Sequence, residues 1–394
     1  MDPHARRRDQ LARALADEGL DAFLISGPVN VSYLTGFSGD SSHLVVCRDR
    51  AVLVSDSRYT AQIAEECPGL ETHIRPTAQK VLAAVADTLA KLGHRRVGFE
   101  SGALTVAEWE ALGQLAPAID WKGGADRVER LRIVKDETEL RQIKEAIAIA
   151  ERAYTVFCAL LRPEDTEAEL CDALEAYVRR AGGKGSSFPP IVAVGPRAAL
   201  PHAPPTGRRV GEGELLLVDW GASGPFYKSD LTRVLNTRRT AAFAGPLTLP
   251  SPPSDGGEGR VRGNGGGPRL EEVHAVVLRA QQKAIAAVRP GVKGEEVDAA
   301  ARSTIAEAGY GDYFGHGLGH GIGLEVHEAP AVRPHSQTIL QPGMVFTIEP
   351  GIYLPGWGGV RIEDDVLVTP DGCEVLTHLP REPVAVFGDR SSLD

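Results

Sequence analysis

The chain has 394 residues, of which 42% are hydrophobic and 24% are charged, and its formal net charge is −10 at pH 7. This length predicts two domains, and the composition is that of an ordinary globular protein. The acidic balance argues against general binding to nucleic acid or to an anionic membrane. The sequence contains no run of about 18 apolar residues, so we expect no membrane-spanning helix.

The N-terminus and the cysteines indicate a cytoplasmic protein. The first residues are basic and continue as an amphipathic helix, without the apolar core and small-residue cleavage site of a signal peptide. The five cysteines are scattered and include no C-x-x-C pair, which favours reduced thiols.

Strand-like and helix-like segments alternate in the first third of the chain, which predicts an α/β N-terminal domain over residues 1–130. The expected elements are helices at 5–18, 59–66, 78–92 and 105–115, strands at 21–26 and 95–100, and a hairpin at 43–59 around a polar turn.

A long helix is expected to open a second domain over residues 131–394. Asp136 is placed to cap this helix, and Glu139, three residues later, completes a capping box. Helices packed on a mostly antiparallel sheet, an α+β domain, should follow. The further expected elements are helices at 166–182, 270–288 and 294–308 and strands at 188–195 and within 214–235.

One segment interrupts the second domain. Residues 245–268 contain eight glycines and five prolines, a composition that buries too little apolar surface to offset the entropy of ordering it. We interpret it as a disordered surface insertion between a strand and a helix.

Four acidic residues of the second domain lie in strand-like apolar contexts: Asp219, Asp230, Glu349 and Glu363. Such residues are costly to bury unless they are paired or bind metal. Taken singly, each also fits an exposed strand face or a buried salt bridge. Together, four carboxylates balance the charge of two divalent cations. A site rich in oxygen favours ions such as Mn²⁺, and a two-metal centre can activate a bridging hydroxide.

The segment "GHGLGHGIGLEVHE" at 315–328 carries His316, His320 and His327 among five glycines. Such a density of glycine disfavours a helix, and the pattern is not the H-E-x-x-H of zinc proteases. Histidines with structural partners are the alternative interpretation. We favour the interpretation that the glycines let the backbone approach a ligand closely, with one imidazole completing the metal site.

These residues, in their order and context, resemble the ligand set of the pita-bread metallopeptidases. Within that superfamily the chain is most similar to the Xaa-Pro aminopeptidase and Xaa-Pro dipeptidase (prolidase) branch, through "LPHAPPT", "YKSDLTR", "GHGIGLEVHEAP" and "PGMVFTIEPGIYLPGWGGVRIEDDVLVT". "GPVNVSYLTGFSG" and "LVSDSRYTAQ" resemble the creatinase-type N-terminal domain. The resemblance implies an α/β creatinase-like N-terminal domain and an α+β pita-bread catalytic domain.

The resemblance also implies a set of metal ligands. Asp219 and Asp230 would bind two divalent ions from adjacent strands, with Asp230 and Glu363 bridging them, and His320 and Glu349 would complete the set. We expect Mn²⁺, with Co²⁺ and Zn²⁺ as alternatives.

Substrate-side roles follow from the same resemblance. Glu349 would assist proton transfer from the nucleophilic water, and His327 would stabilise the tetrahedral intermediate or hold the scissile carbonyl. His316 would line the proline-side pocket, and His202 would lie near the substrate and shuttle protons. Arg361 would orient the neighbouring carboxylate ligand or meet the substrate.

The implied reaction is hydrolysis of the bond between an N-terminal residue and proline by a hydroxide that bridges two metal ions. Because the proline nitrogen of that bond carries no N–H, such specificity requires a pocket shaped around the ring. The expected partner is therefore a proline-containing peptide, and a homodimer is also implied.

Two departures from the family pattern bear on this prediction. The insertion separates Asp230 from His320, although long surface insertions cost little loop-closure entropy. In "HEAPAVRP", Ala331 stands where many dipeptidase-like members have an arginine that binds a dipeptide's carboxylate, and Arg333 follows two residues later. We therefore favour the aminopeptidase.

Four alternatives remain at this point. The first is an Xaa-Pro dipeptidase, and the second is a non-catalytic pita-bread protein that binds a peptide or a partner. A methionine aminopeptidase would lack the N-terminal domain, and a creatinase-like amidinohydrolase would lack the metal ligands that are present here.

Overall fold

The computed structural model describes residues 2–238 and 270–387, so the insertion expected at 245–268 lies outside the described residues. The chain divides into two compact units, Met1–Val134 and Lys135–Asp394. Within the described ranges, no helix is long and apolar enough to cross a membrane.

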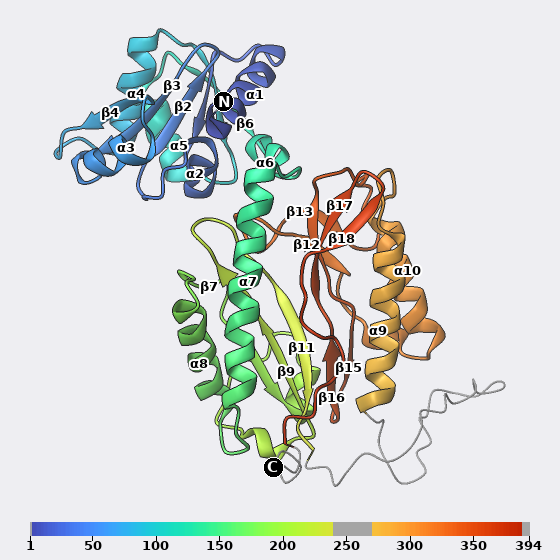
Figure 1. Ribbon diagram of the computed structural model, residues 1–394. Coiled ribbons are helices and arrows are strands. Elements are labelled where there is room, and N and C mark those ends of the chain that lie inside the picture. Colours follow the sequence, from blue (N-terminus) through green and yellow to red (C-terminus); the bar gives the residue numbers. More distant parts are fainter. Residues whose placement is uncertain (1, 239–269, 388–394) are drawn as a thin grey trace. The chain divides into compact units, whose positions relative to one another are not determined.

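The first unit is built on a six-stranded sheet with the strand order β4-β3-β2-β1-β5-β6 (Figure 1). Strand β1 pairs antiparallel with β2 and parallel with β5. The strands are β1 (Ala22–Ile25), β2 (His43–Cys47), β3 (Ala51–Asp56), β4 (Glu71–Arg75), β5 (Arg96–Glu100) and β6 (Asp120–Gly124), and the helices are α1 (Pro3–Asp17), α2 (Pro28–Thr35), α3 (Thr60–Glu66), α4 (Val81–Leu92), α5 (Val106–Leu115) and α6 (Arg127–Arg132).

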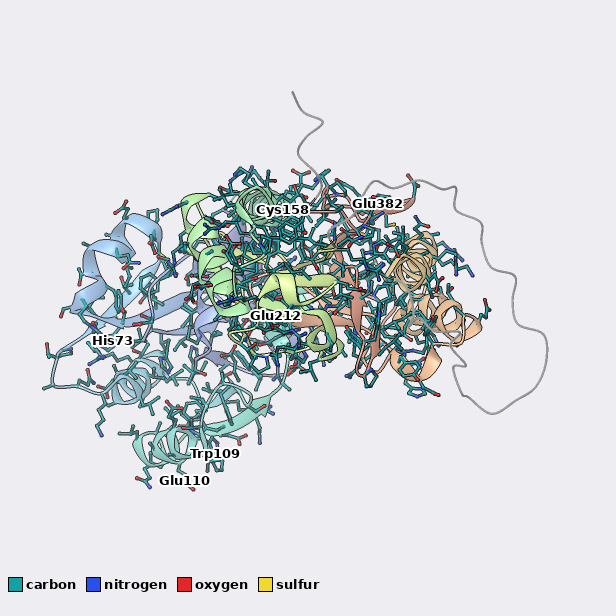
Figure 2. The ribbon with its side chains drawn as sticks, turned by 90° about the horizontal axis from the view of Figure 1, so that it is seen from below. His73, Trp109, Glu110, Cys158, Glu212 and Glu382 are labelled. Carbon is teal, nitrogen blue, oxygen red and sulfur yellow. The ribbon has the colours of Figure 1, made fainter. Side chains whose placement is uncertain are left out.

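Apolar side chains that alternate along the central strands form the core of this unit. Leu24, Val45 and Val97 are fully buried and pack with Val85 and Leu89 of α4. Helix α5 is less covered, and its Trp109 is 47% exposed beside the labelled Glu110 (Figure 2). The α/β character and the 43–59 hairpin expected from the sequence are confirmed, the latter as β2 and β3.

The sequence patterns missed α2, α6 and the strands β4 and β6. Strands β4 and β6 are the two edges of the sheet, and most of their side chains are at least partly exposed. An edge strand with few buried positions has no clear apolar alternation from which it can be recognised.

The second unit opens with α7 (Glu137–Leu160). Asp136 accepts hydrogen bonds from the backbone N–H groups of Thr138 and Glu139, and the Glu139 carboxylate accepts from the Asp136 N–H. The predicted capping box is therefore confirmed. Helix α8 (Glu167–Arg180) follows, and Cys158, labelled in Figure 2, packs near the core between these helices. All five cysteines are free thiols.

Antiparallel sheets form the centre of this unit, with α7 and α8 on one side of the strands and α9 (Leu270–Ala287) and α10 (Gly294–Glu307) on the other (Figure 1). One sheet has the order β11-β9-β8, and a second has the order β13-β12-β14-β17-β18. The strands are β7 (Gly185–Ser186), β8 (Ile191–Val194), β9 (Leu215–Trp220), β10 (Ala222–Ser223), β11 (Leu231–Asn236), β12 (Gly319–Gly321), β13 (Glu328–Val332), β14 (Val345–Ile348), β15 (Gly351–Leu354), β16 (Gly358–Arg361), β17 (Asp364–Thr369) and β18 (Gly372–Val375).

A bridge links Thr232 of β11 to Glu363, which lies between β16 and β17, and so connects the two sheets. Trp220, the last residue of β9, is buried and stacks on Tyr154 of α7, with ring centroids 4.2 Å apart. The predicted α+β architecture with mostly antiparallel strands is confirmed, and the bridge brings the acidic residues of both sheets together.

Candidate metal centre and substrate cavity

A cavity of about 720 Å³ lies within the second unit. All of the candidate site residues from the sequence line it, although they come from segments up to 161 positions apart (202 to 363). They are His202, Asp219, Asp230, His316, His320, His327, Glu349, Arg361 and Glu363.

The acidic residues lie where strands begin, end or bridge. Asp219 is in β9 and Asp230 directly precedes β11. The pairing of these two strands places Asp219 opposite Thr232, so Asp230, two residues before Thr232, is its diagonal neighbour on the same face. Glu363 bridges to β11, and Glu349 directly follows β14. The backbone N–H of Glu349 donates to the carbonyl of Leu318 at 2.8 Å, which ties this ligand segment to the histidine segment.

Three potential ligand atoms converge at one point. Side-chain atoms of Asp230, His320 and Glu363 all lie within 4.8 Å of one another. His320 Nε2 is 3.3 Å from Glu349 Oε1 and 3.7 Å from Asp230 Oδ2. Asp219 lines the same cavity, and its Oδ2 is 2.6 Å from Arg361 Nη2.

Burial gives these carboxylates unusual electrostatics. Desolvation, and then the negative charge of neighbouring carboxylates, raises the pKa values of Asp230 and Glu363 well above their usual range. Burial likewise raises the pKa of Glu349 to about 8. The Oδ1 atoms of Asp219 and Asp230 are buried and have no hydrogen-bond partner among the described residues.

Unpaired buried carboxylate oxygens beside one another are unfavourable unless positive charge compensates them. Arg361 supplies one positive charge against four acidic groups. The donor set of carboxylate oxygens and one imidazole is that of hard or borderline divalent cations, so the residues present fit such ions.

His320 is held in the form that binds metal. Its Nδ1 lies 3.2 Å from the carbonyl of Gly321. Because a carbonyl only accepts, Nδ1 carries the proton, and the lone pair of Nε2 points at Asp230 and Glu349. Burial lowers the pKa of His320 to about 4, which keeps the ring neutral. The strand β12 that carries it agrees with the expectation that the glycines disfavour a helix.

Arg361 positions two acidic residues at once. Its Nη2 donates to Asp219 Oδ2 at 2.6 Å, and its Nε donates to Thr232 Oγ1 at 3.1 Å. Thr232 in turn donates to Glu363 Oε2 at 2.6 Å. Thr232 was not predicted from the sequence, although its position two residues after Asp230 on a strand places both side chains on one face.

His316 is neutral and oriented from both ring nitrogens. Its Nδ1 donates to the carbonyl of Gly317 at 2.8 Å, so its Nε2 accepts from the Tyr353 hydroxyl at 2.9 Å. Burial lowers the pKa of His316 to about 4 and raises the pKa of Tyr353 to about 12, so the phenol keeps its proton. Arg361 donates to the same hydroxyl at 2.8 Å. Tyr353 carried no signal in the sequence.

The other two histidines lie at the open side of the cavity. His202 is exposed on the loop after the short helix Gly195–Ala199. His327 is also exposed, and its ring centroid is 4.2 Å from that of His320. Arg333 is exposed and lines the cavity as well.

Part of the cavity lining is apolar and conformationally stiff. It includes five prolines and a phenylalanine: Phe188, Pro189, Pro190, Pro201, Pro204 and Pro205. Prolines have a fixed φ angle and no backbone N–H, so these residues offer shape rather than hydrogen-bond donors.

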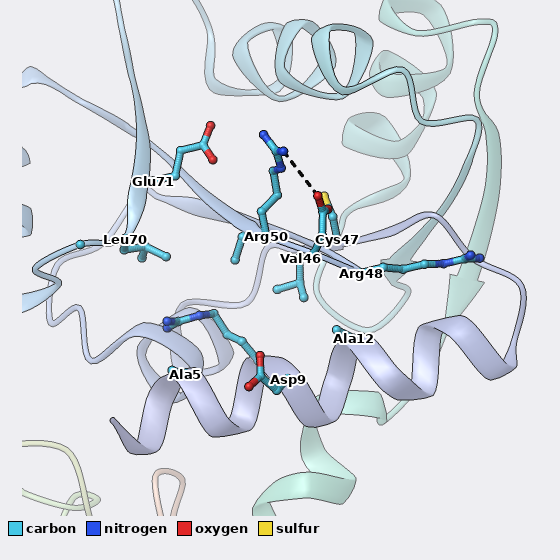
Figure 3. A pocket seen from close by; sticks show the side chains of 13 residues that line it. Ala5, Asp9, Ala12, Val46, Cys47, Arg48, Arg50, Leu70 and Glu71 are labelled. Carbon is cyan, nitrogen blue, oxygen red and sulfur yellow. Dashed lines mark hydrogen bonds and ion pairs between the residues drawn. The ribbon is translucent and has the colours of Figure 1, made fainter. Parts of the chain in front are cut away.

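A smaller cavity of about 330 Å³ lies in the first unit beside α1 and the β2–β3 hairpin (Figure 3). It is lined by three arginines and three acidic residues, so it has no net charge preference; Arg50 Nη2, for example, lies 3.4 Å from Asp49 Oδ2. Burial raises the pKa of Cys47 to about 12, which keeps this thiol unreactive. The cavity offers no counterpart to the carboxylate cluster.

Two family models match the chain. Residues 141–370 match the metallopeptidase family M24, and residues 7–134 match the creatinase/prolidase N-terminal domain. The chain belongs to metallopeptidase family M24. It is therefore a peptidase that uses divalent metal ions, and the predicted creatinase-like and pita-bread fold classes are confirmed.

Individual proteins that are similar to this chain match it along nearly its whole length. The Xaa-Pro dipeptidase of Pyrococcus furiosus is 33% identical over 377 residues, which are 95% of this chain and 99% of that protein. The structure of an X-Pro aminopeptidase from Thermotoga maritima superposes with a TM-score of 0.83 at 35% identity, over 96% of this chain and 100% of that one. The structure of an Xaa-Pro dipeptidase from Bacillus anthracis superposes with a TM-score of 0.84 at 35% identity, over 97% of this chain and 99% of that one.

Proposed function

We propose that this protein is an Xaa-Pro aminopeptidase that hydrolyses the bond between an N-terminal residue and a following proline. The observation that carries the proposal is the cavity itself, which is lined both by a carboxylate cluster with unpaired buried oxygens and by five prolines. A proline ring in the substrate offers a bulky shape and no N–H, and a stiff apolar lining suits both properties. The names of the similar proteins support the same substrate class.

The proposed metal ligands are the three residues whose side-chain atoms converge and the two other carboxylates that line the same cavity. They are Asp230, His320 and Glu363, together with Asp219 and Glu349. Their four negative charges balance two divalent cations. Such ions lower the pKa of water toward neutrality and polarise a carbonyl oxygen. The predominance of oxygen donors favours Mn²⁺, with Co²⁺ and Zn²⁺ as alternatives.

The remaining residues would bind the substrate and move its protons. Glu349 would accept the proton of the attacking water, because its carboxylate lies in the cluster, with Oε1 3.3 Å from His320 Nε2. His327, beside His320, would hold the scissile carbonyl and stabilise the developing negative charge. His202 would deliver a proton to the proline nitrogen as the peptide bond breaks. His316 would line the proline-side pocket.

Arg361 would orient Asp219 directly and Glu363 through Thr232, as the hydrogen bonds of its guanidinium suggest. Fixed carboxylates reduce the rearrangement that metal binding requires.

A second function is supported by one observation. Arg333 lines the cavity and is exposed, so its guanidinium is available to the carboxylate of a bound dipeptide. An Xaa-Pro dipeptidase is therefore the alternative to the aminopeptidase.

The test uses metal-stripped protein reloaded with Mn²⁺. It is offered an Xaa-Pro-Yaa tripeptide, the Xaa-Pro dipeptide and an Xaa-Ala-Yaa tripeptide, and free N-terminal residue is measured. We expect Mn²⁺-dependent cleavage of the first and little of the third. Cleavage of the dipeptide alone would establish the dipeptidase, and no cleavage of either proline peptide by folded, metal-loaded protein would refute the proposal.

We also infer a cytoplasmic homodimer. Free thiols are typical of reducing compartments, and the dimer follows from the family resemblance. Sedimentation velocity at micromolar concentration tests the dimer, which a single species of monomer mass would contradict.

A further inference from the structure

The buried amide of Gln281 on α9 contacts the segments that carry two proposed metal ligands. Gln281 is fully buried, and its Nε2 lies 3.2 Å from the carbonyl oxygen of Ile348, 3.1 Å from that of Ile362 and 2.9 Å from Asp364 Oδ2. All three partners only accept hydrogen bonds, so the nitrogen of the amide must face them. Ile348 and Ile362 directly precede Glu349 and Glu363.

These two carbonyls lie at an opening in a long hairpin. Strands β14 and β17 pair up to Ile348 and Asp364, and β15 and β16 resume pairing at Gly351 and Arg361. The register is the same on both sides of this gap. Residues 349–350 and 362–363 lie between the two paired stretches, so the ladder opens where the two glutamates stand.

The N–H of Ile362 donates across the opening to the carbonyl of Pro350 at 3.4 Å, whereas the N–H groups of the two glutamates turn outward. The N–H of Glu349 donates to Leu318 at 2.8 Å, and the N–H of Glu363 donates to Thr232 at 3.2 Å. The amide of Gln281 donates to the carbonyls of Ile348 and Ile362 together, so it links the two sides of the opening.

The contact with Asp364 holds the amide of Gln281 in place. Asp364 is fully buried and also accepts from Arg233 Nη2 at 2.7 Å, from Arg381 Nε at 2.6 Å and from Thr377. A carboxylate held by two guanidinium groups is a fixed point, so Gln281 ties both sides of the opening to one position.

We propose that Gln281 is a positioning residue that sets the separation between Glu349 and Glu363, and through it the affinity and spacing of the two metal ions. The inference rests on the proposed metal-ligand roles of these glutamates. Partners that orient metal ligands typically change metal affinity by about 10- to 100-fold when they are removed.

The test compares Gln281→Met, which keeps the length of the side chain but removes its donors, with Gln282→Met on the exposed side of the same helix. Metal-stripped proteins are titrated with Mn²⁺ by calorimetry, and Mn²⁺ spectra are recorded by electron paramagnetic resonance. For Gln281→Met we expect one or both sites to weaken about 10- to 100-fold and the exchange-coupled two-ion signal to change. For Gln282→Met we expect wild-type behaviour.

A merely structural role gives a different result. Lower thermal stability of metal-free Gln281→Met, with wild-type Mn²⁺ affinity and an unchanged coupled signal, would overturn the proposal. If Gln281→Met does not fold, Gln281→Asn moves the amide away from the two carbonyls by one methylene. The same loss in this variant supports the proposal, and wild-type affinity and signal overturn it.

The outcome is separable from that of the proposed function. Wild-type protein that binds two Mn²⁺ ions without cleaving proline peptides would refute the peptidase specificity and leave the role of Gln281 standing. Cleavage by wild type with unaltered metal binding in Gln281→Met would refute the role of Gln281 alone.

Discussion

The two sides of the large cavity differ in how their side chains are held. On the carboxylate side, Asp230, Arg361 and Glu363 are almost fully buried and come from paired or bridged strands. On the substrate side, His202, His327 and Arg333 are exposed and line the mouth of the cavity.

This difference matches the two tasks of a metallopeptidase. Metal ions require ligands at fixed separations, and strands and buried hydrogen bonds supply them before any ligand binds. Peptides of varied sequence require groups that adjust, and exposed side chains retain that freedom. Substitutions on the carboxylate side should therefore affect metal binding, whereas those on the substrate side should affect turnover or affinity with the metal retained.

The largest effect is expected for Asp230→Ala. Removing a proposed bridging ligand from the centre of the cluster should abolish both tight Mn²⁺ binding and turnover. The exposed Asp371→Ala is the matched control and should leave both unchanged. Calorimetry and peptide hydrolysis check the prediction, and turnover that persists in Asp230→Ala would contradict the ligand assignment.

A large but different effect is expected for His327→Ala. Loss of one group that stabilises a developing oxyanion typically lowers kcat about 10²- to 10³-fold. Mn²⁺ affinity should stay within a few-fold of wild type, because His327 stands beside His320 rather than among the converging ligand atoms. Steady-state kinetics and a metal titration measure both, with the exposed His378→Ala as control. Unchanged kcat would remove His327 from the mechanism.

A smaller effect is expected for Arg333→Met. An exposed ion pair with a substrate carboxylate contributes up to about 1 kcal/mol, which is roughly a fivefold change in affinity. KM for an Xaa-Pro dipeptide should rise by about that factor, while KM for longer Xaa-Pro peptides should change less. Arg162→Met, whose side chain is 68% exposed elsewhere in the unit, is the control. Equal changes for short and long peptides would exclude carboxylate binding by Arg333.

The smallest effect concerns pH and stability. In metal-free protein the pKa of Glu349 is raised to about 8 by burial, so the folded state binds more protons than the unfolded state between the unfolded pKa near 4.5 and pH 8. Stability therefore falls as pH rises through this window. His320, with its pKa lowered to about 4, has the opposite effect below pH 6.5. We thus expect the Tm of metal-free protein to fall by a few degrees between pH 6.5 and 8.

Metal loading should remove this decline, because the ions replace the protons on the carboxylates. Thermal melts of metal-free and Mn²⁺-loaded protein at several pH values check the prediction. A metal-free Tm that does not fall over this window would contradict the prediction, because carboxylates ionised in both the folded and the unfolded state give no such decline.

Local sequence patterns predicted the structural features that depend on residues close together in the chain. The capping box of Asp136 and Glu139 and the 43–59 hairpin are specified within a few residues, and both are present. Acidic residues in apolar strands, such as Asp219 and Glu363, stand out from the composition around them, whereas the roles of the histidines and the arginine followed from the family resemblance.

Contacts between distant residues could not be predicted in this way. Thr232 acts on Glu363 across 131 positions, and Gln281 reaches Ile362 across 81. A buried Gln in a helix or a Thr in a strand has no periodicity that identifies its partner. Only the folded arrangement of the sheets reveals these residues.

The measurement that tests the account most directly is a Mn²⁺ titration of metal-stripped protein. Metal binding is measured by calorimetry, and hydrolysis of an Xaa-Pro-Yaa peptide is measured in the same samples. The account predicts two ions bound per chain and full turnover only when both are present. Turnover without metal would contradict the account. Mn²⁺ binding that is the same in wild type and in Asp230→Ala would also contradict it, because the ions would then be held outside the cluster.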